Sequence, residues 1–494
     1  MILDPASCYR ALAARDPRFD GVFFVGVTTT GIYCRPVCRA RLPRADRCRF
    51  YPSAAAAETD GFRPCLRCRP EMAPGRSIVD ASGRLARSAA ARIAAGALND
   101  GDMEGLAASL HTSSRQLRRV VKREYGATPV ELAQTQRLLL AKRLLTDSAL
   151  PMAEVAFASG FSSVRRFNAL FRSRYRLNPT QLRRRRSGQT ADGGSFTLTL
   201  DYRPPLQWDA LVSFLAARAI PGVEVVRGHR YLRSVSLAGH RGWIAVAPHP
   251  HAAAALEVEV SLSLAPALMP LLGRIRDLFD LDAEPHVIDA HLAADPLLRG
   301  SVVLRPGLRV PGAMDGFELA LRAVLGQQVS VRGASTLAGR IAQRFADPFP
   351  AGIEGISRYP VSQAALAEAG PDRIAEVGLP RARAQSIARL AAAAAAGSLP
   401  LEPGADVEAT VDLLEELPGI GPWTAQYIAM RALHWPDAFP SSDLGLRKAL
   451  GGAPASHLLR AADRWRPWRA YATMHLWQGL AETPELAHIP AEVA

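Results

Sequence analysis

The sequence predicts a multidomain protein that is mostly α-helical with α+β parts. With 494 residues, the chain is too long for one hydrophobic core and should form three or four domains. All six cysteines lie within the first 68 residues, strand-like alternation falls between residues 196 and 264, and Ala/Leu/Arg-rich helical patterns dominate after about residue 305. We expect domains over residues 1–76, 80–186, 196–300 and 305–494, with a linker over residues 187–195.

The chain shows no signal for a membrane or for export. No run of about 18 apolar residues occurs, and the first ten residues, MILDPASCYR, include an acid where a leader would be basic and apolar. We therefore expect a cytoplasmic protein without membrane contact. In that reducing compartment, clustered cysteines favour a metal site over disulfides.

Positive charge is concentrated in the first part of the chain. Residues 1–190 contain 33 lysines and arginines against 15 acidic residues, whereas the remaining residues are slightly acidic overall. A GC-rich genome would favour arginine over lysine everywhere, but it would not produce this contrast. The asymmetry indicates a polyanionic partner, and we expect double-stranded DNA.

Two short-range cysteine pairs predict a metal site in the first domain. One pair is separated by three residues, the other by two, and 26 residues lie between the pairs. Four soft thiolates in this arrangement suit tetrahedral Zn²⁺, because each pair can fold back to offer both sulfurs to one ion. The predicted ligands are Cys34, Cys38, Cys65 and Cys68. Cys8 and Cys48 have no partner at ligand spacing and are left out.

Zinc coordination would also make a cysteine of this site reactive. A zinc-bound sulfur stays deprotonated, and a thiolate is a good nucleophile toward an alkyl group. Nearby arginines could hold a DNA backbone against the sulfur. They are Arg35, Arg39, Arg41, Arg63, Arg67 and Arg69. The alternative is an inert zinc site that only holds the fold.

Residues 28–71, with the motifs GIYCRPVC and FRPCLRC, resemble the zinc domain of the Ada family of alkylation-response regulators. The resemblance implies that Cys34 irreversibly accepts a methyl group from a methylphosphotriester in DNA, while the other three cysteines act as fellow ligands. Methylation would convert one thiolate to a neutral thioether. The loss of about one negative charge would strengthen DNA binding.

Residues 80–186 contain an internal repeat with a period of fifty residues. Each copy has a short helix, a turn and a second helix with apolar residues at i, i+3 and i+4, which is the pattern of a helix-turn-helix. The matched positions are Leu117, Val120, Val121, Tyr125 and Pro129 in the first copy, and Phe167, Leu170, Phe171, Tyr175 and Pro179 in the second.

In the second copy, Gly160 supplies the turn, and Ser162 or Ser163 supplies the helix N-cap. Arg165 and Arg166 fall opposite the apolar face, where they could contact DNA. A helical hairpin with a solvated basic face is the alternative for one copy, but two copies favour DNA binding. The tandem resembles the AraC-type DNA-binding domain, which implies promoter binding and activation, with RNA polymerase as a partner.

Residues 196–300 are expected to form a small α+β domain. The segments FTLTL, YLRSVSL and ALEVEVSLSL alternate apolar with polar or small residues, as half-buried strands do. They occupy residues 196–200, 231–237 and 255–264. Helical patterns with short loops follow from about residue 305.

The motif LPGIGPW in the last domain is suited to binding a DNA backbone. Gly419 and Gly421 precede a helix that begins at Pro422, and glycines at a helix N-terminus let backbone N–H groups approach a phosphate. An ordinary tight turn between two helices is the alternative. Asp443 follows 22 residues after Gly421, and on its own it is better explained as a helix N-cap.

Together these two features resemble the helix-hairpin-helix DNA glycosylases. The resemblance implies that Asp443 stabilises the developing oxocarbenium ion and orients or activates water. Strand-cleaving members carry a lysine nucleophile where this chain has Trp423, so we expect a monofunctional glycosylase. No cysteine follows Cys68. We therefore expect neither the iron–sulfur cluster of some relatives nor the O6-methylguanine transferase that is often joined to Ada-type domains.

Residues 195–485 resemble AlkA-type 3-methyladenine DNA glycosylase II, which has a TBP-like α+β domain and a helical domain. The resemblance rests on RPPLQWDALVSFLAARAI, MDGFELALRAVLGQQVSV, the glycine motif and RWRPWRAYATMHLW. It implies an electron-rich pocket that attracts a flipped cationic base. The implied pocket residues are Phe214, Trp423, Tyr427 and Trp477, with Gln327 beside them.

Two positions depart from this family's pattern. Gln328 stands where the family often has an apolar wedge, and a glutamine would fill the gap left by the flipped base less hydrophobically. Ser442 stands where some members have a second acid. The first departure concerns the efficiency of the wedge, and the second concerns any role of paired carboxylates.

The sequence thus predicts a monomeric fusion of three activities. A methylphosphotriester sensor and a tandem helix-turn-helix promoter binder precede a glycosylase for alkylated bases such as 3-methyladenine. The alternative is a transcription regulator with a structural zinc site, whose glycosylase half is inactive and only scans DNA.

Overall fold

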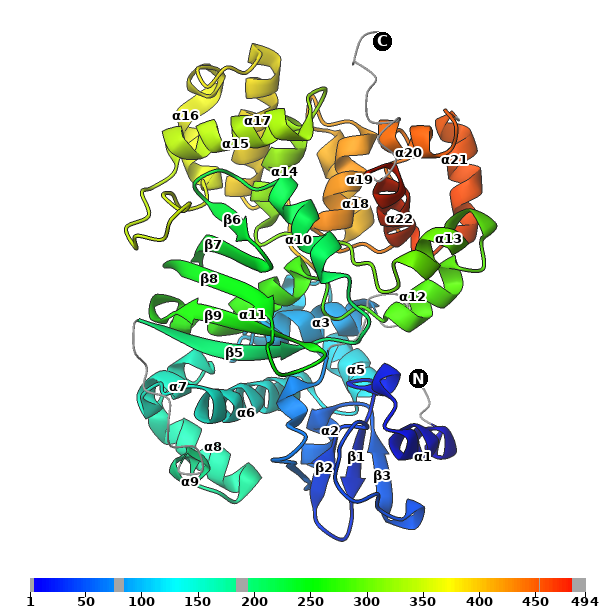
Figure 1. The fold of residues 1–494 in the computed structure, drawn as a ribbon. Coiled ribbons are helices and arrows are strands. Elements are labelled where there is room, and N and C mark those ends of the chain that lie inside the picture. Colours follow the sequence, from blue (N-terminus) through cyan, green and yellow to red (C-terminus); the bar gives the residue numbers. More distant parts are fainter. Residues whose placement is uncertain (1–3, 75–83, 184–193, 453, 482–494) are drawn as a thin grey trace. The chain divides into compact units, whose positions relative to one another are not determined.

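The computed structural model describes residues 4–74, 84–183, 194–452 and 454–481 (Figure 1). The described chain is mostly helical with smaller β parts, which confirms the predicted fold class. It divides into a first unit of residues 1–204, 237–276 and 281–283 and a second unit of residues 205–236, 277–280 and 284–494. Residues 187–193 of the predicted linker lie outside the described residues. None of the described helices is both long and apolar enough to cross a membrane.

The first unit opens with a small α+β domain. Its helix α1 (Pro5–Ala14) is capped by Asp4, whose carboxylate accepts from the N–H of Ala6 and of Ser7. A four-stranded sheet in the order β3-β1-β2-β4 follows. The elements are η1 (Pro17–Phe19), β1 (Phe24–Val27), β2 (Ile32–Cys34), η2 (Ala45–Arg47), β3 (Cys48–Tyr51), α2 (Ala54–Thr59), β4 (Arg63–Pro64) and η3 (Pro70–Met72). β1 pairs antiparallel with β2 and β3, whereas β2 pairs in parallel with β4.

Two helix-turn-helix repeats follow in the first unit. Their helices are α3 (Arg84–Ala94), α4 (Met103–Ala108), α5 (Ser114–Tyr125), α6 (Pro129–Asp147), α7 (Met152–Ala158), α8 (Val164–Tyr175) and α9 (Pro179–Arg183). Buried side chains recur at the predicted interval of fifty residues, at Leu117, Val121 and Tyr125 in α5 and at Phe167, Phe171 and Tyr175 in α8. Ser163 is the N-cap of α8, and Gly160 has a φ of +79° in the preceding turn.

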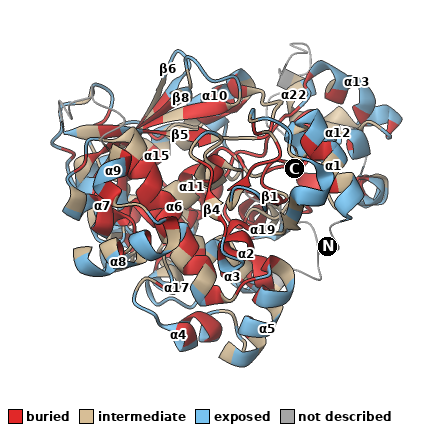
Figure 2. Cartoon of the chain, turned by 90° about the horizontal axis from the view of Figure 1, so that it is seen from below, coloured by how far each residue is buried: buried red, intermediate tan, exposed pale blue. Residues whose placement is uncertain are grey.

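The long helix α6 connects the parts of the first unit. Thr128 and Glu131 form a capping box at its start, and Pro129 occupies its first turn. Much of its length is buried, as its largely red ribbon in Figure 2 shows. It contacts α2, α3, α5, α7 and α9 as well as η3 and β5. A helix that is buried on most sides is placed to join the domains around it.

Three strands complete the first unit. They are β5 (Ser195–Asp201), β8 (His240–Pro248) and β9 (Ala255–Ser261), and β9 pairs antiparallel with the other two. Burial alternates along β5, as expected for a half-buried strand. The strand predicted to reach Leu264 ends at Ser261, because the turn η5 (Leu262–Ala267) follows. Pro266 in this turn lacks the N–H that a strand ladder needs, and α11 (Leu268–Leu278) begins directly after it.

The second unit contains one β-hairpin and a helical assembly. β6 (Glu224–Arg227) pairs antiparallel with β7 (Arg230–Leu237). No strand occurs among the described residues after 284. The helices are α10 (Trp208–Ala217), α12 (Pro285–Leu292), α13 (Pro296–Leu304), α14 (Gly316–Leu325), α15 (Val331–Phe345), α16 (Gln363–Ala375), α17 (Arg381–Ala395), α18 (Val407–Glu415), α19 (Pro422–Arg431), α20 (Leu444–Ala449), α21 (Ala455–Ala462), η6 (Asp463–Trp465) and α22 (Arg469–Ala481). α14 is buried along its whole length except at Arg322, and it contacts α15, α17 and α19.

Candidate metal centre and aromatic pocket

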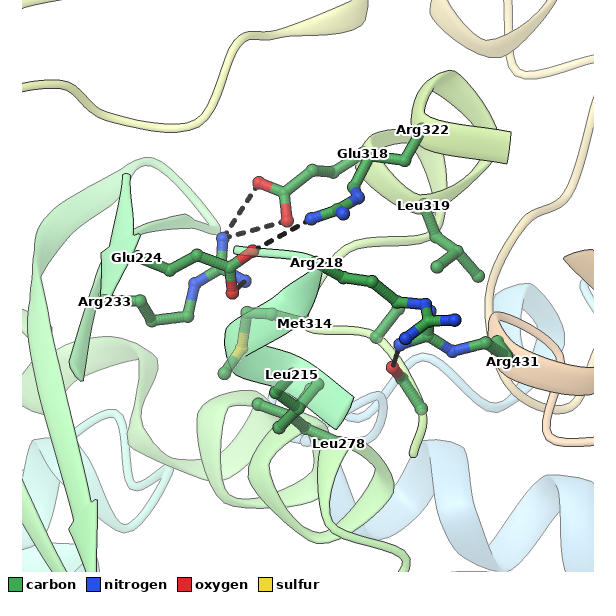
Figure 3. Close-up of a pocket in the computed structure, with 12 residues that line it drawn as sticks. Leu215, Arg218, Glu224, Arg233, Leu278, Met314, Glu318, Leu319, Arg322 and Arg431 are labelled. Carbon is green, nitrogen blue, oxygen red and sulfur yellow. Dashed lines mark hydrogen bonds and ion pairs between the residues drawn. The ribbon is translucent and has the colours of Figure 1, made fainter. Parts of the chain in front are cut away.

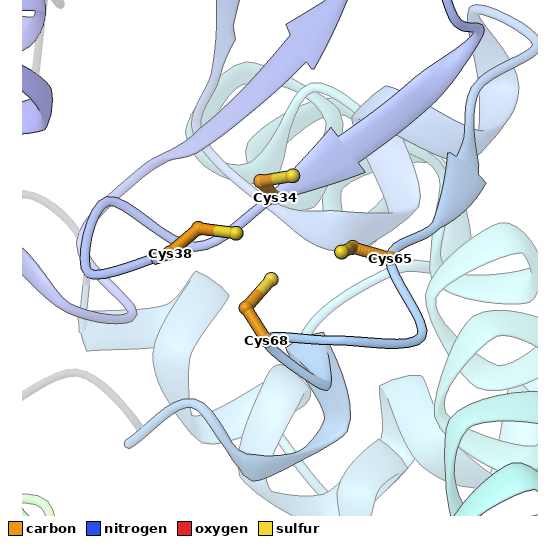
Figure 4. Close-up of side chains that lie close together, drawn as sticks. All are labelled: Cys34, Cys38, Cys65 and Cys68. Carbon is orange, nitrogen blue, oxygen red and sulfur yellow. The ribbon is translucent and has the colours of Figure 1, made fainter. Parts of the chain in front are cut away.

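The four predicted ligand cysteines converge in the first unit (Figure 4). Their Sγ atoms all lie within 4.8 Å of one another. β2 ends at Cys34, and a turn then returns Cys38, whose N–H donates to the carbonyl of Arg35 (3.1 Å). The second pair is brought alongside by the parallel pairing of β2 with β4, in which the N–H of Cys65 donates to the carbonyl of Tyr33 (3.0 Å). Two neighbouring strands therefore set the spacing of the sulfurs.

The donor set of this centre suits Zn²⁺. Four converging thiolates match the ligand set of a tetrahedral zinc site, and without a cation the same thiolates would repel one another. Two backbone N–H groups also point at sulfurs, from Arg35 to Cys68 Sγ and from Arg67 to Cys65 Sγ, each at 3.4 Å. Zn²⁺ is therefore the cofactor of this site.

The arginines near the zinc site differ in their surroundings. Arg35 is buried in ion pairs with Asp20 and with Asp201 (2.8 Å), so its guanidinium is not free to meet a DNA phosphate. Arg69 is likewise tied to acidic neighbours. Of the six arginines that could hold a DNA backbone, these two do not suit that role, because their charges are used inside the protein. The exposed members of the set are Arg39, Arg41 and Arg67, and Arg63 is half-buried.

A buried hydrogen-bond network connects the zinc domain with the helix-turn-helix repeats. Glu58 of α2 accepts from the hydroxyls of Tyr33 (2.9 Å), of Thr135 in α6 (3.0 Å) and of Tyr175 in α8 (3.4 Å). Burial raises the pKa of Glu58 to about 7, although the three hydroxyls favour its charged form. Tyr33 directly precedes Cys34, so the network reaches from a ligand strand to the end of α8. Sequence reasoning missed it, since a glutamate in an alanine-rich segment gives no signal.

A second buried contact lies closer to the metal ligands. Lys142 of α6 forms a buried ion pair with Glu71, and its Nζ lies 3.5 Å from the carbonyl oxygen of Cys65. Asp147, the last residue of α6, pairs with Arg69 at 2.7 Å. The loop that carries the second cysteine pair is thus fastened to α6.

The helix-turn-helix repeats present exposed arginines at equivalent positions. Arg165 and Arg166 lie exposed in the first turn of α8. Arg115 lies exposed fifty residues earlier, in the first turn of α5. The predicted DNA contacts, Arg165 and Arg166, lie in the second copy only, although the period of the repeat also indicates Arg115.

The glycine motif of the second unit forms the turn between α18 and α19. Gly419 has a φ of +88°, and a Cβ there would collide with Ser386 Oγ. Gly421 is the N-cap of α19, with an extended backbone and open space where a Cβ would point. The N-terminus of α19 is therefore open to a close approach from outside.

Asp443 links α19 to the last helix, α22, through hydrogen bonds. It is the N-cap of α20, as its sequence context predicted, and its Oδ1 accepts from the N–H of Leu446 (2.9 Å). The same Oδ1 accepts from the indole N–H of Trp477 (2.9 Å), and Oδ2 accepts from that of Trp423 (2.8 Å). The carboxylate is thus held in place by two aromatic side chains.

The aromatic residues implied by the resemblance lie together around Asp443. Trp423 and Tyr427 are stacked, with ring centroids 5.3 Å apart and an interplanar angle of 11°. Phe214 and Trp477 face each other at 6.5 Å and 17°, and Tyr427 lies 6.3 Å from Trp477 at 47°. The four aromatic rings therefore form one connected group.

The two glutamines near this pocket have different environments. The amide nitrogen of Gln327 donates to the carbonyl of Gly419 (2.8 Å) and to Thr424 Oγ1 (3.0 Å), so Gln327 braces the glycine turn. Gln328 is exposed with a φ of +55°, and Arg383 donates to the carbonyl of Gln327 just before it (2.7 Å). The predicted wedge residue thus projects from a turn held by neighbouring helices.

A cavity of about 30 Å³ in the second unit is lined by charged side chains, as Figure 3 shows. Its charged lining residues are Arg218, Arg233, Arg322, Arg431, Glu224 and Glu318. Arg431 donates to the hydroxyl of Tyr427 (2.7 Å). Burial would raise the pKa of Tyr427, but the nearby arginine charges outweigh burial and lower it to about 8. No sequence motif indicates this cluster.

The fold and these sites define a class of protein. In this class, a regulator with a four-cysteine zinc domain and helix-turn-helix repeats is joined to a domain with a DNA glycosylase fold. The metal binding domain of Ada matches residues 7–71, a helix-turn-helix domain matches residues 106–185, and the AlkA N-terminal domain matches residues 197–315. The "Probable bifunctional transcriptional activator/DNA repair enzyme AlkA" of Mycobacterium tuberculosis is 43% identical over 481 residues, which are 96% of each chain. The chain belongs to this family of bifunctional transcriptional activator/DNA repair enzymes.

The glycosylase part has relatives of its own. DNA-3-methyladenine glycosylase 2 of Escherichia coli is 38% identical over 282 residues, which are 56% of this chain and 96% of the relative. The structure of the 3-methyladenine DNA-glycosylase from Archaeoglobus fulgidus matches with a TM-score of 0.50 at 23% identity, and it covers 57% of this chain and 97% of that one. These matches confirm the glycosylase fold that the motifs predicted.

Proposed function

We propose that the protein is an alkylation-response regulator and a monofunctional DNA glycosylase in one chain. The last part of the chain excises 3-methyladenine and related alkylated bases from double-stranded DNA. The first part accepts a methyl group at Cys34 and then activates transcription as a monomer, with RNA polymerase as its partner at the promoter. The predicted domain ranges 1–76, 80–186, 196–300 and 305–494 belong to this proposal. The main observation in support of the glycosylase activity is that Asp443 accepts hydrogen bonds from two tryptophans of an aromatic pocket.

Phe214 and Trp477 form a slot for a flat base. Their ring centroids are 6.5 Å apart and the rings are nearly parallel. A planar ring stacked between two others needs about 7 Å, so the two walls must separate by about half an ångström to admit a base. Trp423 and Tyr427 complete the walls. A base must leave the DNA stack to reach such a pocket, and the π faces of the walls attract a base that alkylation has made cationic.

Asp443 lies where it can assist the loss of that base. Hydrogen bonds from Trp423 and Trp477 fix the direction of its carboxylate. A fixed carboxylate stabilises the positive charge that develops on the sugar as the glycosidic bond breaks, and it orients the attacking water. Trp423 occupies the position of the lysine nucleophile of strand-cleaving relatives and has no amine, so the reaction ends at the abasic site.

Substitution of Asp443 tests the glycosylase. We expect the Asp443→Asn variant to release alkylated bases from methylated DNA at least about a hundredfold more slowly than the wild type, because the amide lacks the negative charge. Asp412→Asn, an exposed carboxylate of α18, is the matched control and should keep wild-type activity. Equal, background-level release by the wild type and Asp443→Asn would overturn the enzyme proposal. It would favour the alternative, in which the glycosylase-like part of the chain is inactive and only scans DNA.

The zinc centre supports the sensor. Bound Zn²⁺ keeps the cysteines deprotonated. Cys34 Sγ attacks the methyl carbon of a methylphosphotriester; a sulfur–carbon bond forms, and the carbon–oxygen bond breaks with its electron pair on the phosphate. The DNA regains a diester charge, and Cys34 becomes a neutral thioether. The exposed Arg39, Arg41 and Arg67 are available to the DNA backbone during this step.

Mass spectrometry of digested protein tests the transfer. After incubation with methylated DNA, we expect the peptide with Cys34 to gain the mass of one methyl group. Cys8 is a buried cysteine outside the metal cluster, and its unchanged mass serves as the control within the same digest. An unmodified Cys34 would refute the transfer and leave a zinc site that only holds the fold.

A further inference from the structure

We propose that Arg218 and Arg431 set the base preference of the aromatic pocket by lowering its preference for cationic bases over neutral ones. The inference rests on the proposed glycosylase function and concerns the same pocket. It assigns a specificity role to two side chains that lie behind the aromatic walls.

The arginines around the cavity of Figure 3 fall into two groups. Arg322 is paired with Glu224 (3.2 Å), and Arg233 is paired with Glu318 (2.9 Å). Arg218 and Arg431 have no carboxylate partner in the described part of the chain. Arg431 donates only to neutral oxygens, namely the carbonyls of Pro311 (2.8 Å) and Gly312 (2.9 Å) and the hydroxyl of Tyr427 (2.7 Å).

These two uncompensated charges are the ones that touch the pocket walls. The Cζ atom of Arg218 lies 3.7 Å from the ring centroid of Phe214. The Cζ atom of Arg431 lies 4.9 Å from the same centroid and 5.5 Å from that of Tyr427. Two of the four aromatic walls therefore already interact with a cation of the protein.

A cationic base in the slot meets these charges at short range. A base stacked on Phe214 lies about 3.5 Å from that ring and hence within about 7 Å of the Arg218 guanidinium. Like charges at this distance in a partly buried site repel one another strongly enough to change binding about tenfold or more. A neutral base of the same shape keeps the stacking without the repulsion. The pocket therefore accepts neutral damaged bases beside the cationic ones.

Tyr427 adds a dependence on pH to this preference. Its hydroxyl is bonded to Arg431, and the charges that face it come from Arg431 of α19, Arg218, which follows α10, and Arg322 of α14. Arg322 is neutralised by Glu224, while Arg233 and Glu318 on the far side of the cavity neutralise each other. Asp443 is bonded to the neighbouring Trp423. Above its pKa of about 8, the Tyr427 phenolate offsets one uncompensated arginine, so the preference for cationic bases should rise with pH.

The test compares release of one cationic and one neutral base from the same duplex. The probes are 3-methyladenine and 1,N6-ethenoadenine, and single-turnover rates are measured for full-length protein near neutral pH. We expect Arg218→Met to raise the ratio of cationic to neutral base release about tenfold. Arg218→Lys keeps the charge and should keep the wild-type ratio. Arg344→Met removes an exposed arginine of the same unit and should leave the ratio unchanged.

The pH profile of the wild type provides a test that needs no variant. The same ratio should rise through about pH 8, and Tyr427→Phe should remove the rise. A ratio that is the same in Arg218→Met, Arg218→Lys and wild type, together with a flat wild-type pH profile, would overturn the inference while leaving the glycosylase intact. Release of neither base by the wild type would overturn the glycosylase and this inference together.

Discussion

Glu58 carries an ionisable group into the interior of the first unit. Its side chain accepts three hydrogen bonds, yet burial dominates and raises its pKa to about 7 from an ordinary 4.5. The folded protein therefore holds a proton on Glu58 between about pH 4.5 and 7 that the unfolded chain releases. Stability must fall as the pH rises through this window, and the full effect amounts to roughly 3 kcal/mol.

The Glu58→Gln variant tests this pH dependence. Glutamine keeps the size and an acceptor oxygen but does not titrate. We expect the variant to gain stability relative to the wild type by a few kcal/mol when the pH is raised from 5 to 8, measured by urea unfolding of the full chain. Glu104→Gln, an exposed glutamate of α4, should show no such gain. A parallel pH dependence of Glu58→Gln and wild type would contradict the assignment.

At the scale of elements, the two glycines in the turn between α18 and α19 have different roles. Gly419 has a positive φ and no room for a Cβ, whereas Gly421 has an extended backbone and open space. Gly419 is therefore needed by the fold, and Gly421 is available to a ligand. The two residues belong to one motif but should respond differently to the same substitution.

Alanine at each glycine tests this division. Gly419→Ala should destabilise the second unit by about 2 kcal/mol, because alanine is strained at this φ and meets Ser386. Gly421→Ala should cost less than about 1 kcal/mol of stability but weaken DNA binding, since its methyl group would fill the open space where we expect a phosphate to approach α19. Calorimetry and DNA titration of both variants make the comparison. Equal losses of stability would show that Gly421 is structural as well.

Local patterns in the sequence predicted much of this architecture. The cysteine pairs, the fifty-residue repeat and the glycine motif each depend on residues close together in the chain, so spacing alone located them. The contacts of Glu58 with Thr135 and Tyr175, and that of Arg431 with Phe214, depend on how distant segments pack. No short motif carries that information, which is why both clusters became visible only in the structure. The roles of the predicted catalytic and pocket residues remain predictions.

At the scale of the whole molecule, metal removal should separate the two activities. All six cysteines belong to the first unit, whereas Asp443 and the aromatic pocket belong to the second. Four thiols held within 4.8 Å lose their shared cation when zinc is chelated, so the zinc domain should unfold locally.

We expect a strong chelator to abolish methylation of Cys34 and to lower the melting temperature of the first unit. Release of 3-methyladenine should stay within about twofold of the untreated protein, because the second unit has no metal ligand of this kind among its described residues. Added Zn²⁺ should restore methylation, and added Mg²⁺ should not. A parallel loss of base release would show that the glycosylase depends on the metal.

The buried bonds from the zinc domain to α6 and α8 also limit how such regulators can exchange parts during evolution. Glu58 has two of its three hydroxyl donors on α6 and α8, and Glu71, which also pairs with Arg69, has the cation Lys142 on α6. A zinc domain grafted alone onto a foreign regulator would lose these partners together with the packing of α2, η3 and β4 against α6 and α8, which would destabilise the chimaera. Viable recombination points should therefore fall after α8 rather than between α2 and α3. The zinc domain and the helix-turn-helix repeats are then expected to be inherited together, as one unit of recombination.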